Sequence, residues 1–239
     1  MISFIIPAHN EERWIGKCLG SIQATMEKVA EPYEVVVVDD ASRDSTRQIA
    51  EQMGARTLQV ALRKISAVRN AGARAATGDI FFFVDADTQI NEQAVSAALS
   101  ALRTGAAGGG CVFDFDSPTP LWGRIILSLA VRFARVIKWV GGCFLFCTRD
   151  AYQATGGFSE SLNAGEDIAF CQALKKVGRF VIPKPKVLTS PRKLNVVGFW
   201  EVIGLMLTIA VRGSRYESKW VVDILYGRRA QACRKPVKG

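Results

Sequence analysis

Short apolar runs alternate with segments of helical apolar spacing along the first hundred residues. The apolar runs are rich in β-branched and aromatic side chains, which favour strands, and they occupy residues 2–6, 34–38, 56–60 and 80–84. The intervening segments predict helices, namely one capped by Asn10, one ending near Met53, and those over residues 64–76 and 91–103. This alternation is typical of a parallel sheet with helices on both faces.

The second half of the chain is less regular. Its pattern predicts a strand over residues 110–115, a helix over 121–140 and a strand over 143–147. The run Gly108-Gly109-Gly110 predicts a loop before the first of these strands. A further helix is expected to begin at Glu166 and end before Gly178.

Two acidic pairs follow predicted strands. Asp39-Asp40 follows the run 34–38, and Asp85-Ala86-Asp87 follows the run 80–84. Because ligands of such sheets bind beyond the carboxyl ends of the strands, we expect these carboxylates to face a ligand. Oxygen ligands in this spacing suit Mg²⁺ or Mn²⁺, which leave positions for substrate phosphates. The alternatives are a solvated acidic turn at 85–87 and helix capping by Asp40 or Ser42.

A third acidic pair, Glu166-Asp167, stands where a helix is predicted to begin. The pair either supplies a general base or simply complements the helix dipole. No glycine-rich phosphate loop of the Walker or Rossmann type follows any predicted strand, so a phosphate-bearing ligand is expected to be held through a metal ion.

Composition narrows the class of protein. A chain of 239 residues with 49% hydrophobic and 22% charged residues can bury a full core and is not disordered. Six cysteines without a Cys-x-x-Cys pair, and a single histidine, argue against zinc and favour reduced thiols in the cytosol. We expect neither a signal peptide at the start of the chain nor a transmembrane helix, because no stretch of 18 uncharged apolar residues occurs.

The net charge of +9 is concentrated near the end of the chain, where residues 212–239 hold eight basic residues against two acidic ones. Residues 121–140 combine a basic stripe with apolar side chains, and residues 196–211 are nearly all apolar. As a helix, the latter segment reaches about 24 Å, short of a ~30 Å bilayer core. These segments predict contact with an anionic membrane surface, or else buried helices. No nucleic-acid recognition module accompanies the basic tail.

Several short motifs occur in a characteristic order. They are Ile5–Glu12, Val37–Ser42 followed by Asp44 and Thr46, Ala67–Gly72, Ala76–Asp79 leading into Val84–Thr88, Gly156-Gly157-Phe158, and Gly165-Glu166-Asp167. Together they resemble a family 2 glycosyltransferase of the GT-A fold over roughly residues 1–190. The resemblance implies an α/β domain with a Rossmann-like nucleotide-binding half and a mixed central sheet over residues 1–190. Residues 191–239 would then form an apolar helix and basic tail.

The resemblance also implies roles for individual residues. The nucleotide pocket would be lined by Pro7, Ala8, Glu11 and Asp40, with Asp40 near the base and Glu11 near the ribose. Asp85 would lie near the ribose or the donor sugar.

The chemical steps are assigned in the same way. Asp87 would bind the metal ion, and Asp167 would be the catalytic base with Glu166 beside it.

Two features depart from the family pattern. Residues 187–193 lack the late histidine that many relatives carry near the metal, and Gln172-Ala-Leu-Lys-Lys replaces the Gln-x-x-Arg-Trp of processive relatives.

The function implied is an inverting, non-processive transfer of sugar from a nucleotide-diphosphate sugar, with a UDP- or GDP-sugar as donor and Mn²⁺ or Mg²⁺ as cofactor. The acceptor would be lipid-linked, a polysaccharide or another hydroxyl or phosphate. The expected location is the cytoplasm, peripheral at the inner face of the membrane. The alternative is a non-catalytic nucleotide-sugar binder or membrane scaffold of the same fold. A nucleotidyltransferase is disfavoured because Pro7–Glu12 lacks a glycine-rich, basic loop.

Overall fold

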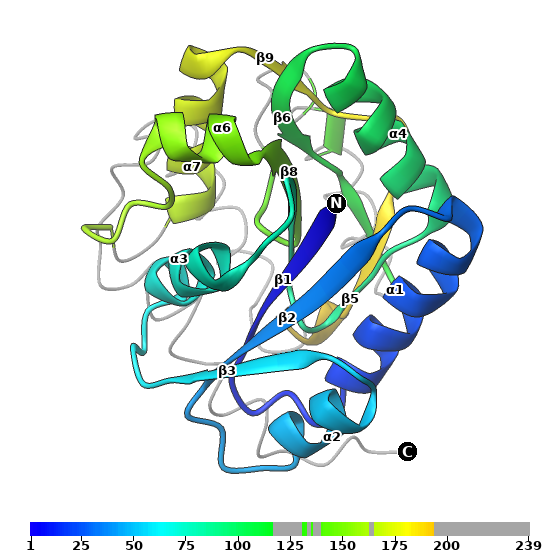
Figure 1. Cartoon of the computed structure of the whole chain (residues 1–239), viewed down its shortest axis with the longest axis vertical. Coiled ribbons are helices and arrows are strands. Elements are labelled where there is room, and N and C mark those ends of the chain that lie inside the picture. The colour runs from blue at the N-terminus through cyan, green and yellow to red at the C-terminus, as the bar shows by residue number, and fades with distance from the viewer. Residues whose placement is uncertain (117–130, 133–134, 136–139, 163–164, 194–239) are drawn as a thin grey trace.

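The computed structural model describes residues 1–116, 131–132, 135, 140–162 and 165–193. In these residues, two sheets form, with strand orders β3-β2-β1-β4-β8-β6-β9 and β5-β10-β7 (Figure 1). The strands are β1 (Ile2–Ala8), β2 (Tyr33–Asp40), β3 (Arg56–Val60), β4 (Ile80–Val84), β5 (Thr88–Gln89), β6 (Ala106–Gly110), β7 (Phe113–Phe115), β8 (Phe144–Thr148), β9 (Arg179–Val181) and β10 (Val187–Thr189). The helices are α1 (Ile15–Val29), α2 (Thr46–Gln52), α3 (Ile65–Ala75), α4 (Glu92–Arg103), α6 (Arg149–Thr155), α7 (Glu166–Val177) and the short 3-10 helix η1 (Pro191–Lys193).

The larger sheet is mixed, as expected. Strand β1 pairs in parallel with both β2 and β4, and β2 pairs in parallel with β3. Strand β8 runs antiparallel to its neighbours β4 and β6. The first four predicted strands are therefore confirmed. Because β1, β2 and β4 run in parallel, their carboxyl-terminal ends lie at the same edge of the sheet.

Helices cover both faces of the larger sheet (Figure 1). On one face, Phe4 and Ile6 of β1 pack in a core with residues of α1, α2 and α4. On the other face, Ile5 packs in a second core with residues of α3, α6 and α7. Because β1 is buried on both faces, its sequence is apolar at every position except Ser3 rather than alternating.

The first helix begins later than predicted. Helix α1 begins at Ile15, and Asn10 does not cap it; Asn10 has a φ of 55° and lies in the preceding loop. The backbone N–H of Asn10 donates to Ser42 Oγ at 2.9 Å, and its side-chain oxygen accepts from the N–H of Arg43 at 2.8 Å. The polar groups of Asn10 thus join the loop after β1 to the loop after β2 instead of starting a helix.

The glycine run was predicted as a loop, and that prediction was wrong. Residues 106–110 form β6, and the expected strand over 110–115 is only its last residue followed by the separate strand β7. The neighbouring strands explain the glycines: an added Cβ at Gly109 would lie 2.0 Å from the Val181 oxygen and 2.5 Å from the Phe146 ring. Glycine is therefore used here for close approach rather than for a turn.

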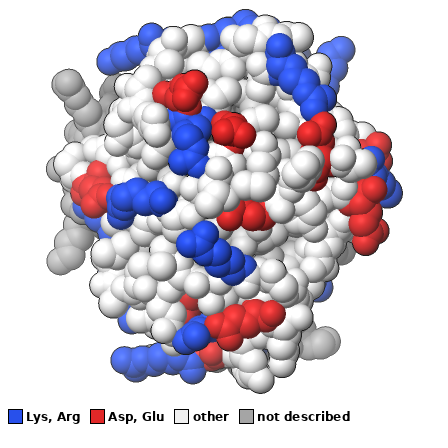
Figure 2. Space-filling model, viewed as in Figure 1, with Lys and Arg blue, Asp and Glu red and all other residues white. Residues whose placement is uncertain are grey.

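Several sequence predictions lie outside the described residues, including most of the helix over 121–140 and all of the segments 196–211 and 212–239. In the described part of the chain, no helix is both long and apolar enough to cross a membrane. The five cysteines described there are buried and form no disulfide. On the face shown in Figure 2, basic and acidic side chains are interspersed.

We expect Gly109→Ala to lower the free energy of unfolding by about 1–3 kcal/mol or more, because the added methyl overpacks the β6–β9 contact. Urea unfolding followed by circular dichroism measures this change. Gly141→Ala is the control, since its Cβ would approach no atom closer than 3.9 Å. Equal midpoints for the two variants would contradict the packing explanation.

Candidate functional site

The predicted acidic residues gather at one edge of the larger sheet. Strand β2 ends in Asp40, and Asp85 and Asp87 follow β4. Strand β1 lies between β2 and β4, and its last residue, Ala8, is opposite Asp39. The carboxyl ends of the three parallel strands therefore place both aspartate motifs, and Pro7 and Ala8 between them, at the edge where ligands of such sheets bind.

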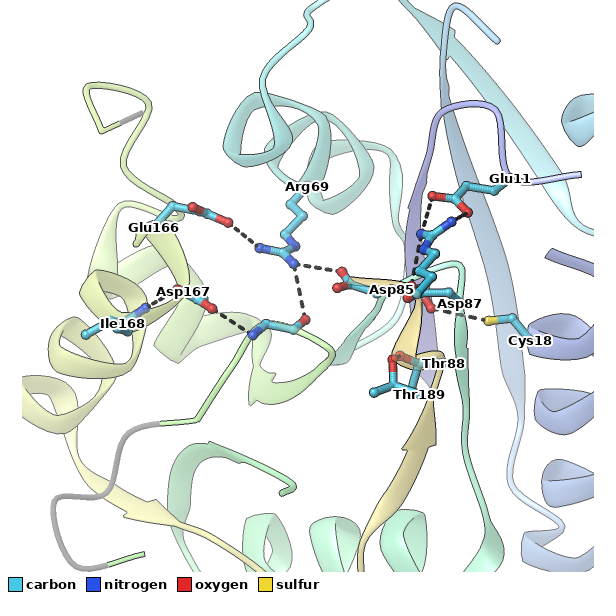
Figure 3. Close-up of polar contacts among 12 residues, drawn as sticks. Glu11, Cys18, Arg69, Asp85, Asp87, Thr88, Glu166, Asp167, Ile168 and Thr189 are labelled. Atoms are coloured by element: carbon cyan, nitrogen blue, oxygen red, sulfur yellow. Dashed lines mark hydrogen bonds and ion pairs between the residues drawn. The ribbon is translucent and has the colours of Figure 1, made fainter. Parts of the chain in front are cut away.

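A buried arginine connects the second aspartate motif to helix α7 (Figure 3). The Arg69 guanidinium lies 2.9 Å from Asp85 Oδ1 and 3.1 Å from Glu166 Oε1, and its side chain is only 2% exposed. The same guanidinium donates to the carbonyl of Gly142 at 3.1 Å. Two carboxylates from distant parts of the chain are thus held by one cation, which offsets the cost of burying them.

Small residues let helix α3 bring Arg69 into this position. A Cβ at Gly72 would lie 2.4 Å from Ile5 and 2.8 Å from Val38, so the helix packs directly on β1 and β2. Gly142 makes a similar close approach, since its Cβ would lie 2.5 Å from the Arg69 guanidinium. The small residues around Arg69 therefore allow close packing, and this packing brings the guanidinium to the buried carboxylates.

A second arginine binds the remaining acids of the edge. Arg192, in η1, contacts both carboxylate oxygens of Glu11, at 2.6 and 2.7 Å. Its Nη2 atom also lies 2.9 Å from Asp87 Oδ2. Figure 3 draws Glu11 and Asp87 in the same part of the site. Glu11 and Asp87, which are distant in sequence, are consequently brought together by a single guanidinium.

Asp40 holds the loop that follows β3. Its Oδ1 atom accepts hydrogen bonds from the backbone N–H groups of Leu62 at 2.7 Å and Arg63 at 3.1 Å. The His9 ring, to which the sequence assigned no role, lies with Nδ1 2.7 Å from the Asp40 carbonyl and Nε2 2.9 Å from the Arg63 guanidinium. Asp40 therefore fixes the position of the loop after β3 at the end of β2.

Asp167 lies next to Glu166 in the first turn of helix α7. Its Oδ2 atom accepts from the Gly142 N–H at 2.8 Å, while the carbonyl of Gly142 is bound by Arg69. Burial, reinforced by the negative charge of Glu166, raises the pKa of Asp167 to about 6. A carboxyl group with such a pKa accepts a proton near neutral pH, as a general base requires.

The chemistry of Asp87 and Glu11 fits a hard divalent cation. Both offer carboxylate oxygens, and the contact of both with Arg192 Nη2 shows that positive charge is accommodated between them. Among the described residues, no group of three or more His, Cys, Asp or Glu side chains could hold a metal ion. Mg²⁺-type ions are commonly bound by one or two carboxylates together with substrate phosphates, so these two carboxylates could contribute to such a site.

The structure brings together five of the predicted residues, Glu11, Asp85, Asp87, Glu166 and Asp167, but through two arginines that the sequence analysis did not assign. One signal was available for Arg69: it is a charged residue among small residues on the inward side of a predicted helix. Arg192 offers a weaker signal, because in the sequence it only precedes the apolar segment 196–211.

With this geometry in place, comparison with known proteins identifies the family. A model of the glycosyl transferase family 2 matches residues 3–170, and the chain belongs to this family. Glycosyltransferase AglE of Haloferax volcanii is 27% identical over 192 residues, which cover 74% of this chain and 62% of that protein. The undecaprenyl-phosphate 4-deoxy-4-formamido-L-arabinose transferase of Pseudomonas paraeruginosa is 28% identical over 155 residues, covering 61% of this chain and 46% of that protein. The chain thus spans less than two thirds of either relative.

Solved structures confirm the GT-A fold. The mannosyltransferase PcManGT from Pyrobaculum calidifontis, in complex with GDP-Man and Mn²⁺, matches with a TM-score of 0.66 at 18% identity, covering 94% of this chain and 68% of that one. The structure of Staphylococcus aureus TarS in complex with UDP-GlcNAc matches with a TM-score of 0.64 at 19% identity, covering 96% of this chain and 72% of that one.

Arg69→Met is expected to lower the free energy of unfolding by about 3–5 kcal/mol, because it leaves the buried carboxylates of Asp85 and Glu166 without this cation. Chemical denaturation at neutral pH measures the loss. The control, Arg47→Met, removes an exposed pair with Glu51 and should change stability by about 1 kcal/mol or less. Similar effects of the two substitutions would show that Arg69 does not hold the site together.

Proposed function

We propose that the protein is a glycosyltransferase that transfers a sugar from a nucleotide-diphosphate sugar to an acceptor, with inversion and without processive polymerisation. One observation carries the proposal: in a family 2 fold, the acids of the sheet edge and the Glu166-Asp167 pair meet around two buried guanidinium groups. This arrangement offers a cation site beside a carboxylate base, which are the two elements needed to release a diphosphate and activate an acceptor.

The proposed donor is a UDP- or GDP-sugar. Solved relatives support both choices, since TarS has been captured with UDP-GlcNAc and PcManGT with GDP-Man and Mn²⁺. We assign Pro7, Ala8, Glu11 and Asp40 to the nucleotide pocket, with Glu11 near the ribose, and Asp85 to the ribose or donor sugar. Mn²⁺ or Mg²⁺ at Asp87 would supply positive charge to the departing diphosphate.

The transfer follows from these positions. The acceptor oxygen attacks the anomeric carbon on the side opposite the diphosphate, and the bond from that carbon to the phosphate oxygen breaks, which inverts the configuration. Asp167 takes the proton of an acceptor hydroxyl as the new bond forms. Arg69 pairs with both Glu166 and Asp85, and would so hold Glu166 beside Asp167 and orient Asp85 toward the sugar.

We propose a lipid-linked acceptor and a peripheral location at the cytoplasmic face of the membrane. A relative that acts with undecaprenyl phosphate supports the acceptor class. Residues 1–190, together with η1 and its Arg192, would form the catalytic domain, and the basic residues of 212–239 would attract an anionic membrane surface.

Donor binding tests the proposed function directly. With Mn²⁺ present, one of the UDP-, GDP-, dTDP- or CDP-sugars should stabilise the protein by about 2.7 kcal/mol at 100 times its Kd. The same donor should be hydrolysed slowly without an acceptor, releasing the nucleoside diphosphate. Unchanged melting with every donor would contradict the proposal, and stable binding without any hydrolysis would indicate the scaffold function instead.

The role of Asp167 gives a pH dependence. With a hydroxyl acceptor, kcat/KM should rise about tenfold per pH unit below about 6 and level off above it, because Asp167 must lose its proton before it can accept another. Asp167→Asn should lower turnover by about 10²–10⁴-fold. The exposed Asp150→Asn is the control. A phosphate acceptor is already ionised, so turnover retained by Asp167→Asn would indicate that acceptor class.

A flat pH profile combined with full activity of Asp167→Asn toward a hydroxyl acceptor would show that Asp167 is not the base. Transfer assays over pH 5 to 9 with the identified donor measure both quantities. The fold of each variant is checked by circular dichroism.

A further inference from the structure

Arg192 occupies the position where the proposed divalent cation would bind. Its guanidinium contacts both oxygens of Glu11 and one oxygen of Asp87, and the three side chains are only 15%, 11% and 4% exposed. A metal ion bound between Asp87 and Glu11 would take carboxylate oxygens, which are ligands that such ions prefer in proteins. A guanidinium and a divalent ion on these oxygens would lie within a few ångströms of each other and repel, so the two cations compete for the two carboxylates.

We propose that Arg192 is a resident cation of the donor site, which a divalent ion must displace, and that the displaced guanidinium then pairs with the diphosphate of the donor. The second half of this statement rests on the proposed function. The competition itself depends only on the contacts of Arg192 with Glu11 and Asp87.

The backbone around Arg192 supports such a movement. Thr189 of β10 pairs with Thr88 of β5, and the Ser190 N–H donates to the carbonyl of Asp87 at 3.2 Å. The Arg192 N–H in turn donates to Ser190 Oγ at 3.3 Å. These bonds fix the backbone of Arg192 to the segment that carries Asp87, so its long side chain stays within reach of the same site after it leaves the carboxylates.

The charges of the site determine when a divalent ion replaces the guanidinium. A guanidinium bound to two carboxylates is stabilised by charge-assisted hydrogen bonds, so a free divalent ion gains less by binding there. A donor diphosphate brings negative oxygens that serve both the metal ion and the guanidinium. Metal and nucleotide are therefore expected to bind cooperatively, with Arg192 coupling the two.

The competition is tested with Mn²⁺ alone, by electron paramagnetic resonance titration of the full chain without nucleotide. Arg192→Met should bind Mn²⁺ about tenfold more tightly than the unmodified protein, because no guanidinium has to be displaced. Arg103→Met is the matched control: it removes the same charge from an exposed pair with Glu31 and should leave Mn²⁺ affinity unchanged. Equal or weaker Mn²⁺ binding by Arg192→Met would overturn the proposal.

The diphosphate contact is tested with UDP, GDP and the corresponding monophosphates at saturating Mn²⁺. Arg192→Met should weaken binding of the preferred diphosphate by about tenfold and leave its monophosphate unaffected. Equal weakening of both would place Arg192 at the nucleoside rather than the diphosphate, and would overturn this part.

Arg192→Lys provides a second variant if Arg192→Met does not fold. It keeps one charge but loses the planar fork, so its Mn²⁺ affinity should exceed that of the unmodified protein. A Mn²⁺ affinity of Arg192→Lys equal to that of the unmodified protein would contradict the proposed displacement of the guanidinium. These binding measurements need no turnover, so their failure is distinguishable from failure of donor hydrolysis.

Discussion

The site depends on the pairing of buried carboxylates with two guanidinium groups. Four acidic side chains converge where the parallel strands end, and all are nearly excluded from water. Without partners, charges in such surroundings each cost several kcal/mol, and they would repel one another. Arg69 and Arg192 remove this conflict, and in doing so they fix segments of the chain that are far apart in sequence. The arginines thus permit the concentration of negative charge that the proposed cation-dependent transfer would require.

The same pairing connects the two halves of the proposed reaction. Arg69 joins Asp85, on the donor side, to Glu166 at the start of the helix that carries the proposed base. Gly142 adds a backbone link, since its carbonyl meets Arg69 while its N–H meets Asp167. On the other side, Arg192 binds the acids that would hold the metal ion. In the proposed reaction, leaving-group release and acceptor activation would therefore fall to adjacent, charge-coupled parts of one structure.

Much of this fold could be predicted from the chain, because apolar runs followed by acidic turns specify both the buried strands and the edge where they end. The acids were found for the same reason. The two arginines were not assigned, since the separations to their partners, 97 residues from Arg69 to Glu166 and 181 from Glu11 to Arg192, leave no local pattern. At Gly109 the local pattern predicted a loop, and this prediction was wrong. Glycine is needed there because the neighbouring strand leaves no room for a side chain. Asn10 likewise has a capping signature but bonds to a loop that only tertiary structure brings near.

Crystals of the full chain grown with Mn²⁺ and the preferred nucleoside diphosphate, with data collected at the manganese absorption edge, test the central claim most directly. We expect an anomalous peak within about 2.5 Å of an Asp87 carboxylate oxygen, with Arg192 moved from that carboxylate to the diphosphate. Nucleotide bound at the ends of β1 and β2 with no peak at Asp87, or with Arg192 still on Glu11 and Asp87 beside a metal ion elsewhere, would contradict it.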